Sequence, residues 1–139
     1  MIRVLLAVAL TAALLAASLP AVESAAADRT TASLDRDIDA LRWASESLLA
    51  EDDPGARRIV TISLPRRSLT AAGVESFSVE CRADCSVAYT LETGASRSRQ
   101  LDVPLATPDG AVRLGSPGTH RVTLGLVTGD DGRVVTVRG

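Results

Sequence analysis

The chain has 139 residues with fifteen basic and seventeen acidic side chains, which give a net charge of −2. This length allows one domain of ordinary size with a hydrophobic leader attached. Every basic residue is Arg, and the Arg residues are interspersed with Asp and Glu, so the basic stripe that nucleic-acid binding needs is missing. Three aromatic residues leave no platform for stacking bases or sugar rings. These features exclude nucleic acid as a partner and indicate no small-molecule substrate.

The N-terminal segment predicts export. Arg3 is a minimal basic start, and residues 4–19 carry no charge. Sixteen helical residues reach ~24 Å, short of the ~30 Å hydrocarbon core unless the helix continues through Pro20 to Val22. Residues 1–22 are therefore one candidate membrane anchor. Alternatively, residues 1–27 are a signal peptide in which Pro20 breaks the helix and small residues direct cleavage after Ala26 or Ala27.

Both hypotheses place the body of the protein outside the cell. Arg3 stays on the cytoplasmic side, so residues from about 28 onward face outward. The protein is then either held in the cell membrane or secreted. A buried core helix is disfavoured because no other segment is apolar enough on all sides to surround it.

An amphipathic helix is expected over residues 31 to about 51, within a unit of residues 28–54 that Pro54 and Gly55 close. Its apolar positions recur at helical spacing: Leu34, Ile38, Leu41, Leu48 and Leu49. One apolar stripe implies one packing surface. That surface is either the protein's own sheet or a protein partner that binds the face made by Leu34, Ile38, Leu41 and Leu48 as a coiled coil.

After Gly55 the apolar period changes from 3.6 to 2, and residues 55–139 are expected to form a β domain. The predicted strands are 59–64, 75–81, 85–92, 97–103, 111–114, 121–128 and 133–138, with Gly-rich and Pro-rich turns between them. Short strands without intervening helices imply an antiparallel arrangement. The predicted class is α+β, mainly β: an apolar helix continuing into an amphipathic one, then a small antiparallel sheet or immunoglobulin-like sandwich of six to seven strands.

Cys81 and Cys85 lie between two alternating runs and would flank a three-residue hairpin loop. In an oxidising compartment the favoured interpretation is a structural disulfide. Two buried free thiols, a redox pair or half of a metal site are the alternatives. The spacing does not fit the usual redox motif, and a zinc site would need a second pair of ligands.

Candidate chemistry is sparse, and no catalytic, cofactor-binding or metal-binding residue is assigned. A nucleophile and base pair of Ser116 or Ser86 with His120 is conceivable, but no nucleophile elbow accompanies it. Four acidic residues match positions 1, 3, 5 and 12 of a calcium loop: Asp35, Asp37, Asp39 and Glu46. Ala40 replaces the required Gly, so a solvated helix face is expected instead. Asp130 and Asp131 are expected at a hairpin tip, and the Arg57-Arg58 and Arg66-Arg67 pairs are expected to form a solvated rim rather than a lipid-headgroup patch.

Two resemblances add to these predictions. Residues 117–126 with 131–137 are similar to the last hairpin of prokaryotic immunoglobulin-like domains, in which a Tyr that fastens a corner stands where this chain has His120. The exclusive use of Arg with eleven Asp is typical of a GC-rich genome and indicates a haloarchaeal source. Over nearly its full length the chain resembles short haloarchaeal exported proteins encoded among type IV pilus-like secretion genes. The segments that carry this likeness are 1–6, 16–21, 55–61, 102–105 and 134–138.

The resemblance implies an accessory protein of the cell envelope. The order of helix then sheet also looks like a pilin, but the chain has neither a prepilin cleavage site ahead of the apolar run nor the buried Glu near its start. The expected function is a non-enzymatic, exported and membrane-anchored envelope protein with a structural or interaction role. A freely secreted binding module after signal cleavage is the alternative, and a secreted hydrolase dependent on His120 is a remote one.

Overall fold

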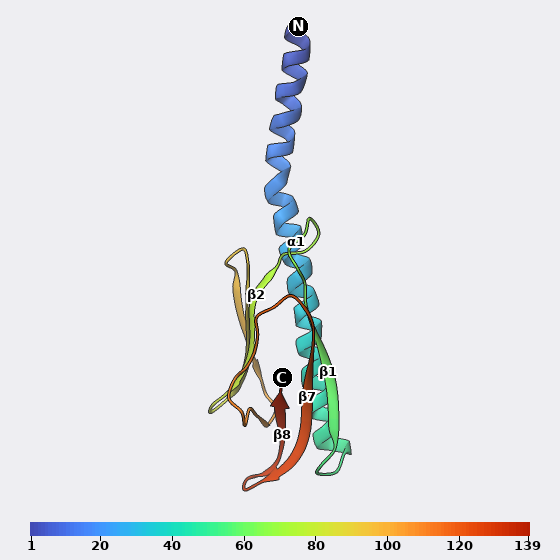
Figure 1. Ribbon diagram of the computed structural model, residues 1–139, viewed down its shortest axis with the longest axis vertical. Helices are drawn as coiled ribbons and strands as arrows, with labels where there is room; N and C mark the ends of the chain where they lie inside the picture. Colours follow the sequence, from blue (N-terminus) through green and yellow to red (C-terminus); the bar gives the residue numbers. More distant parts are fainter.

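The computed structural model describes residues 1–139 as one long helix and eight strands (Figure 1). Helix α1 spans Ile2–Glu51. The strands are β1 (Arg57–Leu64), β2 (Val74–Cys81), β3 (Cys85–Leu91), β4 (Ser96–Leu101), β5 (Leu105–Ala106), β6 (Val112–Leu114), β7 (Gly118–Gly129) and β8 (Gly132–Arg138).

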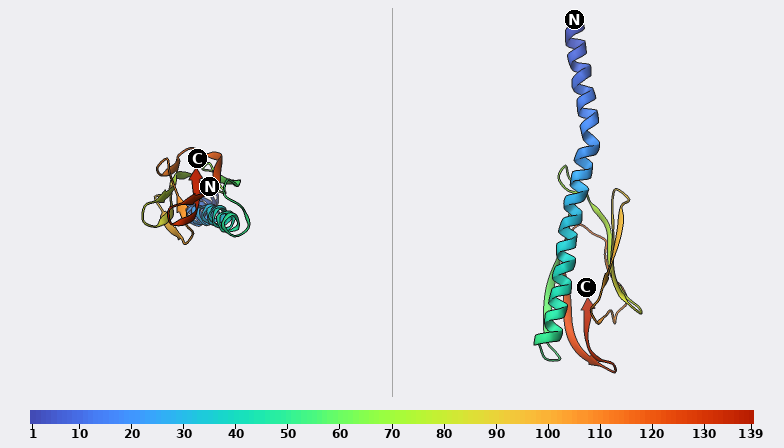
Figure 2. Two further views of the ribbon diagram at one scale, coloured as in Figure 1. Left: turned by 90° about the horizontal axis from the view of Figure 1, so that it is seen from below. Right: turned by 180° about the vertical axis from the view of Figure 1, so that it is seen from behind.

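Helix α1 is continuous and has Pro20 in its interior. Its 50 residues extend ~75 Å at 1.5 Å per residue. The N-terminal half projects away from the rest of the protein, and every residue from 1 to 25 is exposed (Figures 1 and 2). Of the two alternatives, a helix broken at Pro20 and one that continues past it, the structure has the continuous helix, because a proline removes only one N–H donor and the turns on either side remain helical. The helix ends at Glu51, as predicted.

The strands form two four-stranded sheets, which confirms the mainly β, sandwich-like class. The first sheet has the order β1-β7-β8-β5, and the second has the order β4-β3-β2-β6. All pairs are antiparallel except β5 with β8, which is parallel. The count is eight rather than six to seven because two-residue β5 has too few residues for a visible alternation. Strand β4 ends at Leu101 instead of residue 103, three residues before Pro104, which has no N–H to extend a ladder.

One hydrophobic core of 26 buried residues joins both sheets and the C-terminal half of α1. Four helix residues at its centre have exposed fractions of 1% or less: Leu34, Ile38, Leu41 and Leu48. The hypothesis that this face binds a protein partner is therefore wrong. The physical reason is that these side chains complete the protein's own core, so no apolar stripe remains for another chain.

Polar contacts fix the same half of α1 to the edge strands of both sheets. On the free edge of β1, the Ser63 backbone N–H donates to the Asp37 carboxylate at 2.8 Å. On the edge strand β4, Arg99 donates to the Asp39 carboxylate, also at 2.8 Å. The helix thus lies across the open side of the sandwich, and Asp37 satisfies an edge donor that would otherwise be unpaired.

Candidate functional site

The N-terminal half of α1 has the dimensions of a membrane-spanning segment. Residues 4–22 form an uncharged stretch, which extends ~28 Å against a hydrocarbon core of ~30 Å. By length and composition, α1 is the one helix that can cross a membrane, and none of its most apolar 18-residue window is buried. Continuation through Pro20 provides the length that residues 4–19 alone do not reach.

The polar groups in this stretch bond to the helix itself. The Thr11 hydroxyl donates to the Ala7 carbonyl at 2.8 Å, and the Ser18 hydroxyl donates to the Leu15 carbonyl at 2.9 Å. In a hydrocarbon environment each polar group must find a partner within the protein. These two hydrogen bonds meet that requirement without a neighbouring helix.

The junction between the projecting half and the β domain is held by the end of the loop that joins β1 to β2. The buried Thr30 hydroxyl donates to the Ala72 carbonyl at 2.9 Å, and the Ala72 N–H donates to the Ala26 carbonyl at 3.3 Å. Within the loop, the Ser68 hydroxyl accepts the Ala71 N–H at 3.1 Å, and the Ser68 N–H donates to the Ala71 carbonyl at 2.9 Å. The loop is therefore a fixed turn fastened to α1.

A cavity of about 600 Å³ lies at this junction. Its lining comes from the helix, from the loop and from the turn that follows β3: Leu19, Val22, Glu23, Ala26, Arg67, Ser68, Leu69, Ala71, Ala72, Glu92 and Thr93. Leu69 shares this lining with Leu19 and Val22 at the end of the uncharged stretch and with Glu23 and Ala26 just beyond it. Leu69 is 85% exposed. Its exposure cannot be predicted from sequence alone, because a lone Leu in a polar loop has no periodicity.

The Arg66-Arg67 pair lies in the same loop. Neither guanidinium takes part in any of the five ion pairs of the structure, whereas Arg58 pairs with Asp52 at 2.8 Å. The sequence placed the two Arg pairs on either side of the first strand and predicted a solvated rim. In the structure Arg57 and Arg58 begin β1 near the C-terminal end of α1, and Arg66 and Arg67 follow the end of β1.

The acidic residues that matched a calcium loop lie on one helix. Asp37 and Asp39 contact the two sheets as described, and no group of three or more His, Cys, Asp or Glu side chains that could hold a metal ion occurs in residues 1–139. Desolvation by burial raises the pKa of Asp37 above its usual value, although the Ser63 N–H and the Arg36 charge act in the opposite direction. The expected helix is present, but these two carboxylates attach it to the sheets.

His120 lies at the start of β7 and contacts a backbone atom. Its Nε2 is 2.7 Å from the Ser116 carbonyl oxygen, four residues upstream. Since a carbonyl can only accept, Nε2 carries the proton in this bond. The contact resembles the corner bond that a Tyr hydroxyl makes in immunoglobulin-like domains. Ser116 offers its carbonyl here and not its hydroxyl, and Ser86 lies on β3 of the other sheet.

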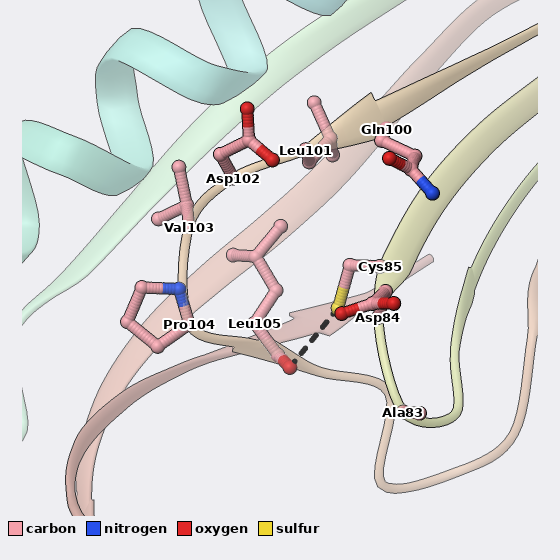
Figure 3. A pocket seen from close by; sticks show the side chains of 9 residues that line it. All are labelled: Ala83, Asp84, Cys85, Gln100, Leu101, Asp102, Val103, Pro104 and Leu105. Atoms are coloured by element: carbon pink, nitrogen blue, oxygen red, sulfur yellow. Dashed lines mark hydrogen bonds between the residues drawn. The ribbon is translucent and has the colours of Figure 1, made fainter.

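Cys81 and Cys85 are joined by a disulfide and occupy opposite positions on β2 and β3. Figure 3 shows the adjacent cavity of about 360 Å³, lined by residues 83–85 and 100–105. The Cys85 sulfur lies 3.1 Å from the Leu105 carbonyl oxygen. A disulfide sulfur has no proton to donate, so this is a close sulfur–oxygen contact. Asp130 and Asp131 lie at the β7–β8 turn, as expected for a hairpin tip.

Residues 1–139 match the sequence model of a family described as a domain of unknown function, DUF7311, and the chain belongs to this family. No curated protein and no solved structure matches the sequence.

Proposed function

We propose that this member of the DUF7311 family is an exported, membrane-anchored protein of the cell envelope with a structural or interaction role and no catalytic activity. The continuity of α1 supports this proposal most directly. An exposed apolar stretch of bilayer length runs without interruption into a half that is fixed in the β domain. A protein built in this way holds its domain at a constant distance from the membrane surface.

The charges at the two ends of the stretch support the orientation. Arg3 precedes the stretch, and Glu23 and Asp28 are the first charged residues after it. Under the positive-inside rule, Arg3 remains in the cytoplasm and the β domain lies outside. The Cys81–Cys85 disulfide is consistent with an oxidising compartment.

The likeness to exported haloarchaeal proteins supports a more specific role, in which the β domain contacts a pilus-like secretion apparatus. Co-purification of secretion subunits with the full-length protein from solubilised membranes would support this role. Recovery of the protein without them, under conditions that keep the apparatus intact, would contradict it.

The alternative is a freely secreted module released by cleavage after Ala26 or Ala27. Retention is favoured because Ala26 is only 6% exposed and its carbonyl accepts the Ala72 N–H, so cleavage would cut the helix beside this contact. Intact mass of the protein from its native host distinguishes the two. We expect the full chain in the alkali-washed membrane pellet, whereas loss of residues 1–26 or 1–27 would rule out the anchor.

The non-enzymatic part of the proposal has its own test. His120 is the only imidazole, and its Nε2 is occupied by the Ser116 carbonyl. A hydrolytic activity on ester or peptide substrates that purified protein shows and the His120→Ala variant lacks would overturn it. The natural protein and the His120→Ala variant are purified in the same way and compared, which is the matched control.

A further inference from the structure

We infer that the loop between β1 and β2 is a second membrane contact, in which Leu69 enters the outer interfacial layer and Arg66 and Arg67 bind lipid phosphates. The inference rests on the proposed membrane anchor. It adds that the β domain touches the bilayer surface on a defined side instead of standing clear of it.

The first argument is the level of Leu69 along the helix axis. Leu69 lines one cavity together with Leu19 and Val22, which belong to the last turns of the uncharged stretch. If residues 4–22 cross the hydrocarbon core, the end of that core lies at Val22. Leu69 is then placed where hydrocarbon gives way to headgroups.

The second argument is the chemistry of the loop. An exposed Leu is common on protein surfaces and means little by itself. Leu69, however, has an exposed fraction of 85%, higher than any other large hydrophobic residue of the β domain, and is separated from two Arg residues by Ser68 alone. Arg guanidinium groups bind phosphate oxygens in a bidentate manner, and basic residues beside an apolar anchor add attraction to anionic lipid.

The third argument is that the loop is held in place. Ser68 bonds to the backbone of Ala71, and Ala72 bonds to Ala26 and Thr30 of α1. The backbone N–H groups of Ser68 and Ala71 stay hydrogen-bonded within this turn while Leu69 points outward. Figures 1 and 2 show the loop at the end of the β domain nearest the projecting half of α1, with the β7–β8 hairpin at the opposite end.

Nearby acidic groups limit the strength of the contact. Glu23 and Glu92 line the same cavity as Arg67, although neither pairs with it. These carboxylates reduce the local positive charge. The loop is therefore better suited to orienting a domain that α1 already anchors than to binding a membrane by itself.

The test uses full-length protein in vesicles of phosphatidylcholine with phosphatidylglycerol. In a Trp43→Phe background, Leu69→Trp reports on the loop and Val127→Trp serves as the matched control, since Val127 is also an exposed apolar residue but lies near the opposite end. We expect Leu69→Trp to emit at shorter wavelength, to be quenched by lipids brominated near the headgroup, and to be quenched by aqueous acrylamide severalfold less than Val127→Trp.

The outcomes separate the two proposals. Equal acrylamide quenching at both positions, in protein that floats with vesicles in high salt, would overturn the loop contact and leave the anchor intact. Protein that does not float in high salt would overturn the anchor and the inference that rests on it.

Because Trp itself favours membrane interfaces, a second measurement uses no added Trp. We expect hydrogen exchange of the backbone amides of residues 66–71 in vesicles to be faster in Arg66→Gln/Arg67→Gln than in the natural protein, with the β7–β8 hairpin unchanged. Identical exchange of residues 66–71 in both proteins would contradict the assigned phosphate contacts.

Discussion

The Thr30 hydroxyl donates a 2.9 Å hydrogen bond to the Ala72 carbonyl, 42 residues away in the chain. Thr30 is 2% exposed, so water has little access to either group. This bond and the neighbouring Ala72–Ala26 bond fasten the loop to α1 where the apolar half leaves the β domain. The position of the β1–β2 loop on α1 therefore depends on a few buried polar groups.

Replacing Thr30 by Val should show this dependence. Val has nearly the same shape but leaves the buried Ala72 carbonyl without a partner, which should lower the free energy of unfolding by about 1–3 kcal/mol. Thermal unfolding of the detergent-solubilised full chain, followed by circular dichroism, measures the loss. Thr61→Val, at an exposed position of β1, is the control and should change the midpoint little. An equal shift in both variants would contradict the role of Thr30.

Asp37 should make stability depend on pH. Burial raises its pKa in the folded protein, so the folded state holds its proton more tightly than the unfolded state. The carboxylate then disfavours folding at neutral pH, and this penalty is released as pH falls through the raised pKa toward the unfolded value of about 3.9. Asp37→Asn removes the charge and retains an oxygen that can accept the Ser63 N–H.

The measurement is the difference in unfolding midpoint between the natural protein and Asp37→Asn. The natural protein should gain stability relative to the variant as pH is lowered from 7 to about 4. A difference that stays constant over this range, or moves the other way, would show that burial does not dominate at this carboxylate. Asp84→Asn, in the loop between β2 and β3, controls for general charge effects.

Alternation and helical spacing predicted most of the elements, because both reflect burial on one face. The strands from 59–64 to 133–138 correspond to β1 to β4 and β6 to β8, and the helix end at Glu51 follows from Pro54 and Gly55. The sequence left open whether the helix breaks at Pro20 or runs on past it, and the helix is continuous there. One feature set by a tertiary contact was missed. Two-residue β5 exists only because it pairs with β8.

The junction illustrates the same limit for the candidate site. The sequence identified the apolar stretch and the Arg66-Arg67 pair as separate features. Nothing in either segment indicates that a loop more than 40 residues further along returns to the level of Leu19 and Val22. That relationship depends on how β1 lies against α1, which is a property of packing between distant segments. The sequence left two alternatives for the apolar stripe of the helix, its own sheet or a protein partner, for a related reason, since an apolar stripe does not say which surface will cover it.

The helix face made by Leu34, Ile38, Leu41 and Leu48 should behave as core. Leu41→Ala, at a position with no exposed surface, should lower the free energy of unfolding by about 2–5 kcal/mol by leaving a cavity between α1 and the sheets. Trp43→Ala, two residues away and 66% exposed, is the matched control and should have a small effect. Similar losses in both variants would contradict the packing of this helix face against the sheets.

Tyr89 should tolerate loss of its hydroxyl. The side chain is 3% exposed, its oxygen lies near Thr31 and Asp35 without a well-formed hydrogen bond to either, and burial raises its pKa above the usual value. Tyr89→Phe removes an unsatisfied polar atom, so the free energy of unfolding should stay the same or rise by about 1 kcal/mol. Tyr89→Ala should instead cost about 3–5 kcal/mol through lost packing. A clear loss of stability in Tyr89→Phe would reveal a partner for the hydroxyl.

The disulfide should stabilise the hairpin that carries it. Cys81 and Cys85 are four residues apart, and loop-closure entropy for so small a ring is worth about 2 kcal/mol. Cys81→Ala/Cys85→Ala should lower the unfolding midpoint accordingly, and Ala avoids placing a hydroxyl at the buried position 85. Adding a reductant should lower the midpoint of the natural protein and leave the double variant unchanged. If the reductant shifts both equally, or neither, the bridge makes no contribution to stability.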